Sequence, residues 1–329
     1  MSAPPRVSVV ITAHNAAGTI AACLRSVAAQ RGVAPGQLEI VLVDDRSEDG
    51  TDHAAQSVHL TNWRFLRVTE YTPGPLTARQ VALDRGFRAA RGEVIFVTDA
   101  DAVVPPDWIA RTLGRLEATA ADAVAGPVEF RSAERLRGPL QTVDSLYYLS
   151  VARILNALGF PSGLLFAHCA FRREVYARMG GFEGTGFALT EDLAFARALR
   201  RHGFRLVFQS HPLVSVGAAP SWRDLVRRAQ RTSAGGVSAL SVALSAWILP
   251  LPLLAVGSLV AGPLALKLFL LRYALGAAFT ALAVLAARRF SFLPHALIYE
   301  PVAVLIGLRV LGLVLRRRQV EWGGVQYGR

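Results

Sequence analysis

Lysine is almost absent from this sequence, and acidic residues are fewer than basic ones. Lysine and arginine together number 36 against 24 aspartates and glutamates, which gives a formal net charge of +12, and Lys267 is the only lysine. The basic excess is densest after Ser238, beside the most apolar part of the chain. This distribution fits attraction to anionic lipid headgroups better than a nucleic-acid-binding surface, although a generally arginine-rich composition is an alternative explanation. We expect a membrane partner and no nucleic acid.

Cysteine is also scarce. Cys23 and Cys169 are too few for a disulfide framework, and their spacing is not that of metal ligands. A reduced domain that faces the cytosol is the simplest interpretation. The apolar run at 7–11 is too short for the core of a signal peptide and predicts a first strand instead.

Glycine-rich phosphate-binding motifs are missing as well. The sequence contains neither the G-x-G-x-x-G pattern of dinucleotide-binding folds nor the G-x-x-x-x-G-K pattern of P-loop proteins. Both classes therefore lose support.

Apolar, β-branched runs alternate instead with segments of helical spacing. The runs at 6–12, 38–43 and 93–98 are typical of buried strands, and helical patterns lie between them at 18–29 and 76–90. Such alternation predicts an α/β fold with a mostly parallel sheet that is covered on both faces. Similar patterns predict further strands at 65–68, 123–130 and 205–208 and further helices at 105–116 and 191–202.

Acidic clusters follow two of these strands directly. Asp44 and Asp45 follow the second predicted strand, and Asp99 and Asp101 follow the strand at 93–98. Because parallel strands end at the same edge of a sheet, both clusters are expected on one rim, where such sheets bind their ligands. Two carboxylates one residue apart suit a hard divalent cation, Mg²⁺ or Mn²⁺. The three-residue pattern alone is weak evidence, and its place at a strand end strengthens it.

The last third of the chain is strongly apolar. The segment 239–260 has no charged residue and is long enough to span a bilayer, and 264–287 and 293–315 are nearly as apolar. Their prolines predict kinks or hairpins. Arginine pairs and triplets flank 293–315 at both ends, which conflicts with the positive-inside rule for a single span, so a re-entrant or interfacial segment is an alternative. The basic stretch 222–231 is either an interfacial helix or a solvated helix face.

Four segments together resemble family 2 glycosyltransferases with the GT-A fold. They are VSVVITAHN at 7–15, VDDRSEDGT at 43–51, ARGEVIFVTDAD at 90–101, and GGF at 180–182 followed by TED at 190–192. The resemblance covers about residues 6–232. It implies a Rossmann-like mixed, mostly parallel sheet and transfer of a sugar from a nucleotide-sugar donor.

The resemblance also implies a role for each matching position. The donor nucleotide would be held by Ala13, His14, Asn15, Asp44, Asp45, Arg79, Asp99, Gln230 and Arg231. Asp99 and Asp101 would ligate the metal. Asp192 would be the general base that deprotonates the acceptor hydroxyl, and Glu191 beside it is a second candidate catalytic residue. The end of the chain, 320–327, is similar to tails of lipid-linked members.

Several positions depart from the pattern of the family. His14 stands where an aromatic residue is usual, Gln80 and His168 stand where asparagine is common, and Thr232 follows Arg231 in place of tryptophan. The missing tryptophan argues against a processive polysaccharide synthase. Structural roles remain alternatives for four residues: a hydrogen-bonded histidine for His14 and His168, a helix cap for Asp44, and a carboxylate favoured by the helix dipole for Asp192.

These observations lead to one expected organisation and function. We expect a GT-A catalytic domain at 1–221, an amphipathic interfacial segment at 222–237, a membrane region with two to three hydrophobic helices at 238–315, and a basic tail at 316–329. We expect an inverting, metal-dependent transferase at the inner cell membrane, with its catalytic domain in the cytoplasm and a lipid or lipid-linked acceptor. The alternatives are a processive polysaccharide synthase, a polyprenyl-phosphate glycosyltransferase and a non-catalytic membrane scaffold.

Overall fold

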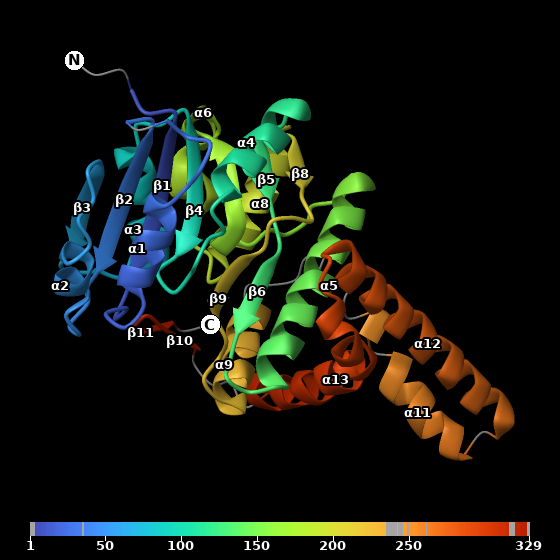
Figure 1. The fold of residues 1–329 in the computed structure, drawn as a ribbon. Helices are drawn as coiled ribbons and strands as arrows, with labels where there is room; N and C mark the ends of the chain where they lie inside the picture. Colours follow the sequence, from blue (N-terminus) through green and yellow to red (C-terminus); the bar gives the residue numbers. More distant parts are fainter. Residues whose placement is uncertain are drawn as a thin grey trace. The chain divides into compact units, whose positions relative to one another are not determined.

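The computed structural model describes residues 4–34, 36–234, 242, 246–248, 250–260, 262–315 and 320–327. The chain forms two compact units. The first unit comprises Met1–Val128, Gly163–Gly217 and Trp322–Val325, and the second comprises Glu129–Ser162, Ala218–Glu321 and Gln326–Arg329. Each unit is described by itself below, with the element labels of Figure 1.

A seven-stranded sheet forms the centre of the first unit, in the order β3-β2-β1-β4-β7-β5-β8 (Figure 1). β7 runs antiparallel to its neighbours β4 and β5, and the other pairings are parallel. The mixed, mostly parallel α/β sheet expected from the sequence is confirmed. The strands are β1 (Val7–Ala13), β2 (Leu38–Asp45), β3 (Trp63–Val68), β4 (Val94–Asp99), β5 (Ala123–Ala125), β7 (Cys169–Arg172) and β8 (Leu206–Phe208).

Helices cover this sheet, and the burial of the central strands reflects that cover. Every residue of β1 is buried, as is every residue of β2 after Leu38. This explains why both strands read as continuous apolar runs rather than as alternating ones. The remaining elements of this unit are α1 (Ile20–Ala28), α2 (Thr51–Gln56), α3 (Ala78–Ala89), α4 (Trp108–Ala118), the 3₁₀ turn η1 (Phe166–His168), α6 (Arg173–Arg178), α7 (Gly181–Thr185), α8 (Glu191–Arg201) and β9 (Val214–Gly217).

An aromatic cluster fixes α3 and α8 against the sheet. The ring centroid of Phe171 on β7 lies 5.2 Å from that of Phe87 on α3 and 4.9 Å from that of Phe195 on α8. All three side chains are at most 2% exposed. Aromatic pairs at these distances add to the free energy gained by apolar burial. The cluster therefore holds the two helices that carry Arg79 and Glu191.

A buried carboxylate ties the central strands together. Glu39 on β2 accepts hydrogen bonds from Ser8 Oγ on β1 at 2.6 Å and from the backbone N–H and Nε of Arg91 at 2.9 and 2.7 Å. Burial by itself would raise the pKa of Glu39, but these hydrogen bonds and the Arg91 charge outweigh it and hold the pKa below its ordinary value. This otherwise costly charge is therefore compensated within the core.

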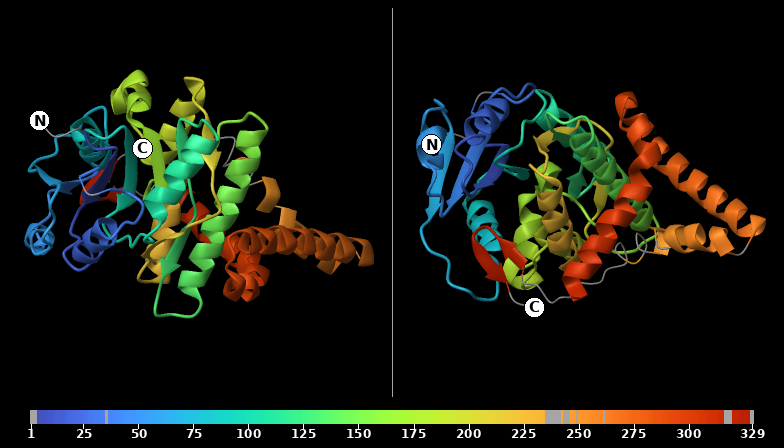
Figure 2. Two further views of the ribbon diagram at one scale, coloured as in Figure 1. Left: turned by 45° about the horizontal axis from the view of Figure 1, so that its top comes forward. Right: turned by 90° about the horizontal axis from the view of Figure 1, so that it is seen from below.

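The second unit is mainly helical. It contains β6 (Val128–Arg131), α5 (Arg137–Ala157), α9 (Trp222–Ala234), α11 (Pro250–Val260), α12 (Pro263–Ala286), the 3₁₀ turn η2 (Phe290–Phe292) and α13 (Leu293–Leu315). Near the C-terminus, β10 (Val320–Trp322) and β11 (Val325–Tyr327) pair as a hairpin whose turn belongs to the first unit. α12 packs against both α11 and α13 (Figure 2).

Two helices, Pro263–Ala286 and Phe290–Leu313, are long and apolar enough to cross a membrane. Their apolar side chains face outward to a large extent, with Leu264, Leu282 and Leu305 each more than 60% exposed. Between them lies a buried ion pair, because Arg272 Nη1 on α12 contacts Glu300 Oε2 on α13 at 3.1 Å. Charges in an apolar helix pair are expected to be paired in this way.

The predicted strand at 123–130, the prolines of the apolar region and two predicted segments near the C-terminus differ in their outcome. The prediction of one strand at 123–130 was wrong, because the segment divides into β5 and β6 at Gly126 and Pro127. Proline has no N–H to donate to a neighbouring strand. Gly126 lies against the His168 ring, where an added Cβ would be only 2.2 Å away. Pro263 starts α12, where the missing N–H costs no hydrogen bond. The predicted segment 239–260 and the arginines at 316–318 fall partly or wholly outside the described residues.

Two glycines make a matched pair for testing the packing of the first unit. A Cβ at Gly92 would lie 2.4 Å from the backbone nitrogen of Ser8, whereas nothing lies within 4 Å of one at Gly114, in the middle of α4. We expect Gly92→Ala to lower the free energy of unfolding by about 2 to 3 kcal/mol. Gly114→Ala should raise it by about 0.5 to 1 kcal/mol, because alanine favours the helix. Urea unfolding in detergent, followed by tryptophan fluorescence, measures both. Equal effects would contradict the described packing at Gly92.

Candidate active site

The ends of three neighbouring strands bring the predicted site residues to one rim of the sheet. β1 lies between β2 and β4, and in register Ala13 is opposite Asp44 while Thr12 is opposite Asp99 (Figure 1). The loops after these strands therefore start side by side. Ala13 itself is buried, so it contributes backbone rather than an exposed side chain.

The carboxylates of Asp44 and Asp45 are held differently. Asp44 is fully buried, and neither of its oxygens accepts a hydrogen bond from any residue that the structure describes; its ionic partner is Arg67 Nε at 3.5 Å. Asp45 pairs with its neighbour, accepting from Arg46 Nε at 2.7 Å and Nη2 at 3.0 Å. Asp44 is not a helix cap, because α2 begins after Gly50 and Asp49 accepts from the N–H of Thr51.

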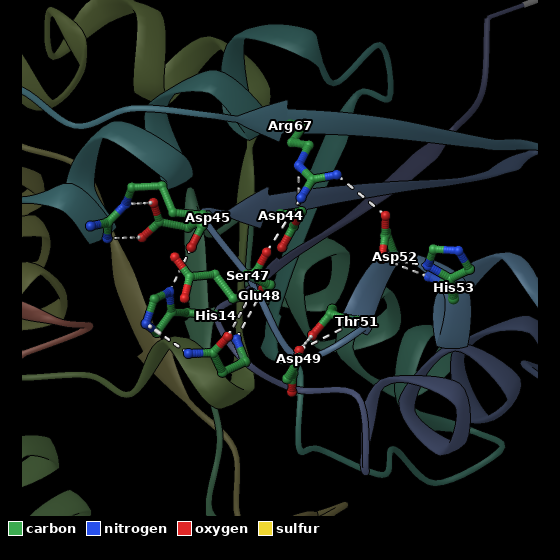
Figure 3. A network of polar contacts seen from close by, with 12 residues as sticks. His14, Asp44, Asp45, Ser47, Glu48, Asp49, Thr51, Asp52, His53 and Arg67 are labelled. Atoms are coloured by element: carbon green, nitrogen blue, oxygen red, sulfur yellow. Dashed lines mark hydrogen bonds and ion pairs between the residues drawn. The ribbon is translucent and has the colours of Figure 1, made fainter.

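Hydrogen bonds join the loop at 13–15 to the loop after β2 (Figure 3). His14 Nδ1 lies 2.6 Å from the carbonyl oxygen of Asp45, so Nδ1 carries the proton and donates it. The N–H of Asn15 donates to Ser47 Oγ, and Asn15 Oδ1 accepts from the N–H of Glu48, both at 2.9 Å. Asn15 needs this support because its φ of 51° lies in the left-handed region. The two loops thus form one connected wall.

Arg79 connects two acidic residues that are distant in the sequence. From α3 it donates through Nη2 to Asp99 Oδ1 and through Nε to Glu191 Oε1, each at 2.5 Å. Burial by itself would lower the pKa of Arg79, but the two carboxylates outweigh it and hold the pKa above its ordinary value. Because a guanidinium is planar and has several donors, it can serve both carboxylates at once.

Asp192 and Glu191 begin α8 and differ in their surroundings. Glu191 is 5% exposed and its charge is neutralised by Arg79. Asp192 is half-buried, and its Oδ1 accepts from the N–H of Leu193 at 2.8 Å. Both stand in the first turn of the helix, where its dipole favours carboxylates. Of the two, Asp192 is the more exposed to solvent.

Asp101 is anchored at the edge of β9. Its Oδ2 accepts from the N–H of Gly217 at 3.1 Å, and a Cβ at Gly217 would lie only 3.0 Å from that oxygen. Among the described residues, no group of three or more His, Cys, Asp and Glu side chains could hold a metal ion. Mg²⁺ usually keeps waters and substrate phosphates in its shell, so one or two carboxylates suffice. Asp99 and Asp101 both lie at the end of β4, Asp99 paired with Arg79 and Asp101 bonded to the N–H of Gly217.

Two departures from the family pattern have structural explanations. His168 is fully buried, with Nδ1 2.9 Å from the carbonyl oxygen of Pro127 and Nε2 2.8 Å from Gln209 Nε2. Burial lowers the pKa of His168 to about 4, so it stays neutral. Gln80 forms a capping box with Thr77 and also binds the backbone of Gly186 and Ala188, in the segment before α8. Both residues support the fold rather than project toward a ligand.

Two predicted residues lie in the second unit, and two arginines that pair with Asp44 and Asp45 were not predicted. Gln230 and Arg231 lie on α9, in the second unit, and so they are not placed relative to the acidic residues. Sequence reasoning missed Arg46 and Arg67, which neutralise Asp45 and Asp44. Arg46 could have been noticed as a direct neighbour of the acidic pair. Arg67 gave no such signal, since its partner is 23 positions away and only strand pairing brings them together.

Residues 8–180 match the sequence model of glycosyl transferase family 2. The match spans more than half of the chain, which therefore belongs to this family. The expected family and fold are confirmed, and the chain is a glycosyltransferase of the family 2 type.

Individual relatives agree with this assignment. The chain is 26% identical to glycosyltransferase AglE of Haloferax volcanii over 243 residues, which are 71% of this chain and 73% of that protein. It is 36% identical to the succinoglycan biosynthesis protein ExoO of Rhizobium meliloti over 117 residues, but these cover only 36% of this chain and 31% of that protein. The mannosyltransferase PcManGT of Pyrobaculum calidifontis, solved with GDP-Man and Mn²⁺, superimposes with a TM-score of 0.56 at 23% identity, over 92% of this chain and 88% of that one. This likeness shows a shared fold.

The Arg79 bridge predicts a specific effect on stability. Lysine keeps the charge but cannot present two donors in a plane, so Arg79→Lys should lower the free energy of unfolding by about 2 kcal/mol. Arg88→Lys is the matched control on the same helix, because Arg88 is mostly exposed and its ion pair with Asp84 joins two residues of that helix four positions apart. That change should cost less than about 0.5 kcal/mol. Urea unfolding compares the two, and equal losses would show that the bridge does not stabilise the fold.

Proposed function

We propose that this protein is an inverting, metal-dependent glycosyltransferase. It moves a sugar from a nucleotide-sugar donor to a hydroxyl of a lipid or lipid-linked acceptor at the cytoplasmic face of the cell membrane. The observation that supports the proposal is the bridge from Asp99 through Arg79 to Glu191, the residue that precedes the general-base candidate Asp192.

The donor is proposed to lie along the rim formed by the ends of β1, β2 and β4. The wall made by Ala13, His14, Asn15 and Asp45 offers backbone and side-chain polar groups to the base and ribose. Asp99 and Asp101 would hold a divalent cation on the diphosphate, which supplies positive charge where the leaving group becomes more negative. The solved complex of PcManGT with GDP-Man and Mn²⁺ supports a donor of this class.

The transfer step needs a base on the acceptor side. Asp192 accepts the proton of the acceptor hydroxyl while the hydroxyl oxygen forms a bond to the anomeric carbon of the sugar. At the same time, the bond from that carbon to the diphosphate oxygen breaks. A single displacement of this kind inverts the anomeric configuration. Glu191, already paired with Arg79, acts as a positioning residue that fixes the start of α8.

Two helices of the second unit support the proposed acceptor class. Pro263–Ala286 and Phe290–Leu313 are each apolar over a length that crosses a bilayer, with less than a third of either apolar window buried. Core helices of water-soluble proteins are mostly buried, so exposure on this scale favours a lipid surroundings for these helices. We propose that 222–237 is interfacial, that 238–315 is the membrane region, and that 316–329 is a basic tail. In this proposal, the catalytic domain at 1–221 acts on an acceptor in the membrane.

Loss of the base tests the chemistry. We expect Asp192→Asn to lower kcat by about 100-fold to 10,000-fold, because the amide cannot accept the proton, with donor affinity nearly unchanged. Asp107→Asn is a suitable control, since this carboxylate is exposed and pairs with Arg111 on the surface of α4. Labelled nucleotide sugars and a membrane lipid extract, read by mass spectrometry, report the transfer and the identity of the acceptor. Full activity of Asp192→Asn would refute the proposed role.

Removal of metal tests the cation site. We expect EDTA to abolish transfer and added Mn²⁺ or Mg²⁺ to restore it. In Asp101→Asn, binding of Mn²⁺ in the presence of UDP or GDP should weaken by about tenfold or more, equivalent to about 1.4 kcal/mol. Electron paramagnetic resonance of Mn²⁺ measures this binding directly. Transfer that persists in EDTA would contradict metal dependence and leave the family assignment intact.

A further inference from the structure

A tight turn near the C-terminus belongs to the first unit. Trp322–Val325, here called the C-terminal turn, connects β10 to β11. Its two central residues, Gly323 and Gly324, have φ values of 55° and 71°. Positive φ at both central positions is the conformation of the two-residue hairpin turn that glycine adopts without strain. The paired glycines therefore build a narrow turn with an accessible backbone.

Arg46 connects this turn to the end of β2. Its Nη2 donates to the carbonyl oxygen of Gly323 at 3.1 Å, across 277 positions of sequence. The same guanidinium is held by the bidentate pair with Asp45 and lies over the ring of Tyr71, with 5.6 Å from its central carbon to the ring centroid. Because Arg46 is fixed by two other residues, its bond to Gly323 gives the turn a defined place.

His14 lies beside Gly324, the second glycine of the turn. A Cβ built on Gly324 would lie 3.7 Å from His14 Nε2, which is ordinary van der Waals contact. Since His14 Nδ1 donates to the carbonyl oxygen of Asp45, Nε2 is the acceptor nitrogen of the neutral ring. The polar edge of the imidazole thus lies beside the turn. The C-terminal turn, the loop at 13–15 and the loop after β2 come together at this point.

We propose that the C-terminal turn is part of the donor site and forms a wall of the subsite for the nucleoside. This inference rests on the proposed function, which puts the nucleotide along the wall of His14 and Asp45. A nucleoside presents hydrogen-bond donors and acceptors on its base and hydroxyls on its ribose. Backbone N–H and carbonyl groups that no side chain shields can pair with such groups and give orientation.

This placement separates binding from chemistry. The turn accepts a hydrogen bond from Arg46 and lies beside His14, whereas Arg79 pairs with Asp99 and Glu191. Loss of the turn should therefore weaken the affinity for the nucleotide and raise KM for the donor. The value of kcat at saturating donor should change little, because neither the base nor the proposed cation ligands are altered.

Binding of nucleoside diphosphates by the full chain tests the inference. Isothermal titration with UDP, GDP, ADP and dTDP in the presence of Mn²⁺ compares the unaltered protein with Gly324→Val, which adds a side chain next to His14. Gln326→Val is the matched control, since Gln326 is exposed on β11 of the same hairpin. A chain that ends at Gln319 removes the turn altogether. We expect both changes to the turn to weaken the tightest nucleotide about tenfold, the effect of losing one or two polar contacts, and the control to bind nearly as the unaltered protein does.

Hydrogen exchange supplies a second measurement, which nucleotide binding would not affect if the C-terminal turn had only a structural role. In the unaltered protein, the bound nucleotide should slow exchange in the peptide 320–327. If the unaltered protein binds a nucleotide but Gly324→Val and the shortened chain bind it equally well, or if exchange at 320–327 is unaffected, the turn is not part of the donor site. If the unaltered protein binds none of the four nucleotides, the proposed function itself is overturned.

Discussion

The guanidinium group of Arg79 holds two acidic residues of the candidate site, Asp99 and Glu191, close to each other. Without Arg79, the carboxylates of Asp99 and Glu191 would lose the counter-charge that they share, and their mutual repulsion would be uncompensated. The aromatic contacts of Phe171 with Phe87 and Phe195 bring the two helices near the sheet, but they are not directional enough to set the orientation of a side chain. The bridge adds that orientation, and the position of Asp192 follows from it.

The sheet and the location of the acidic clusters were accessible from the sequence because both depend on local patterns. An apolar run followed by aspartate identifies a buried strand and its end, as with β2 and Asp44 or β4 and Asp99. The contacts that complete the site were not accessible, since they join residues far apart in the chain: Arg79 with Glu191, Arg67 with Asp44, and Arg46 with Gly323. The reversed strand β7 also escaped prediction, because its apolar residues fit either direction.

The unusual residues of this chain fall into two groups. His168 and Gln80 replace the common asparagines and have become part of the packing, in one case because Gly126 leaves room for an imidazole ring and in the other because the longer amide reaches the segment before α8. His14 is different: it stays half-buried on the rim, between the loop after β2 and the C-terminal turn. Of these three residues, only His14 therefore keeps its side chain at the rim of the sheet.

The ion pair between Arg272 and Glu300 has a consequence for how the apolar helices can enter a bilayer. Gly276 lets the Glu300 carboxylate sit against α12, and Trp247 Nε1 donates to the same carboxylate at 3.0 Å. Either helix alone would carry an unpaired Arg272 or Glu300 into hydrocarbon, whereas these two charges neutralise each other when the helices are joined. In a membrane, this ion pair would favour insertion of α12 and α13 as a joined pair over insertion of either helix alone.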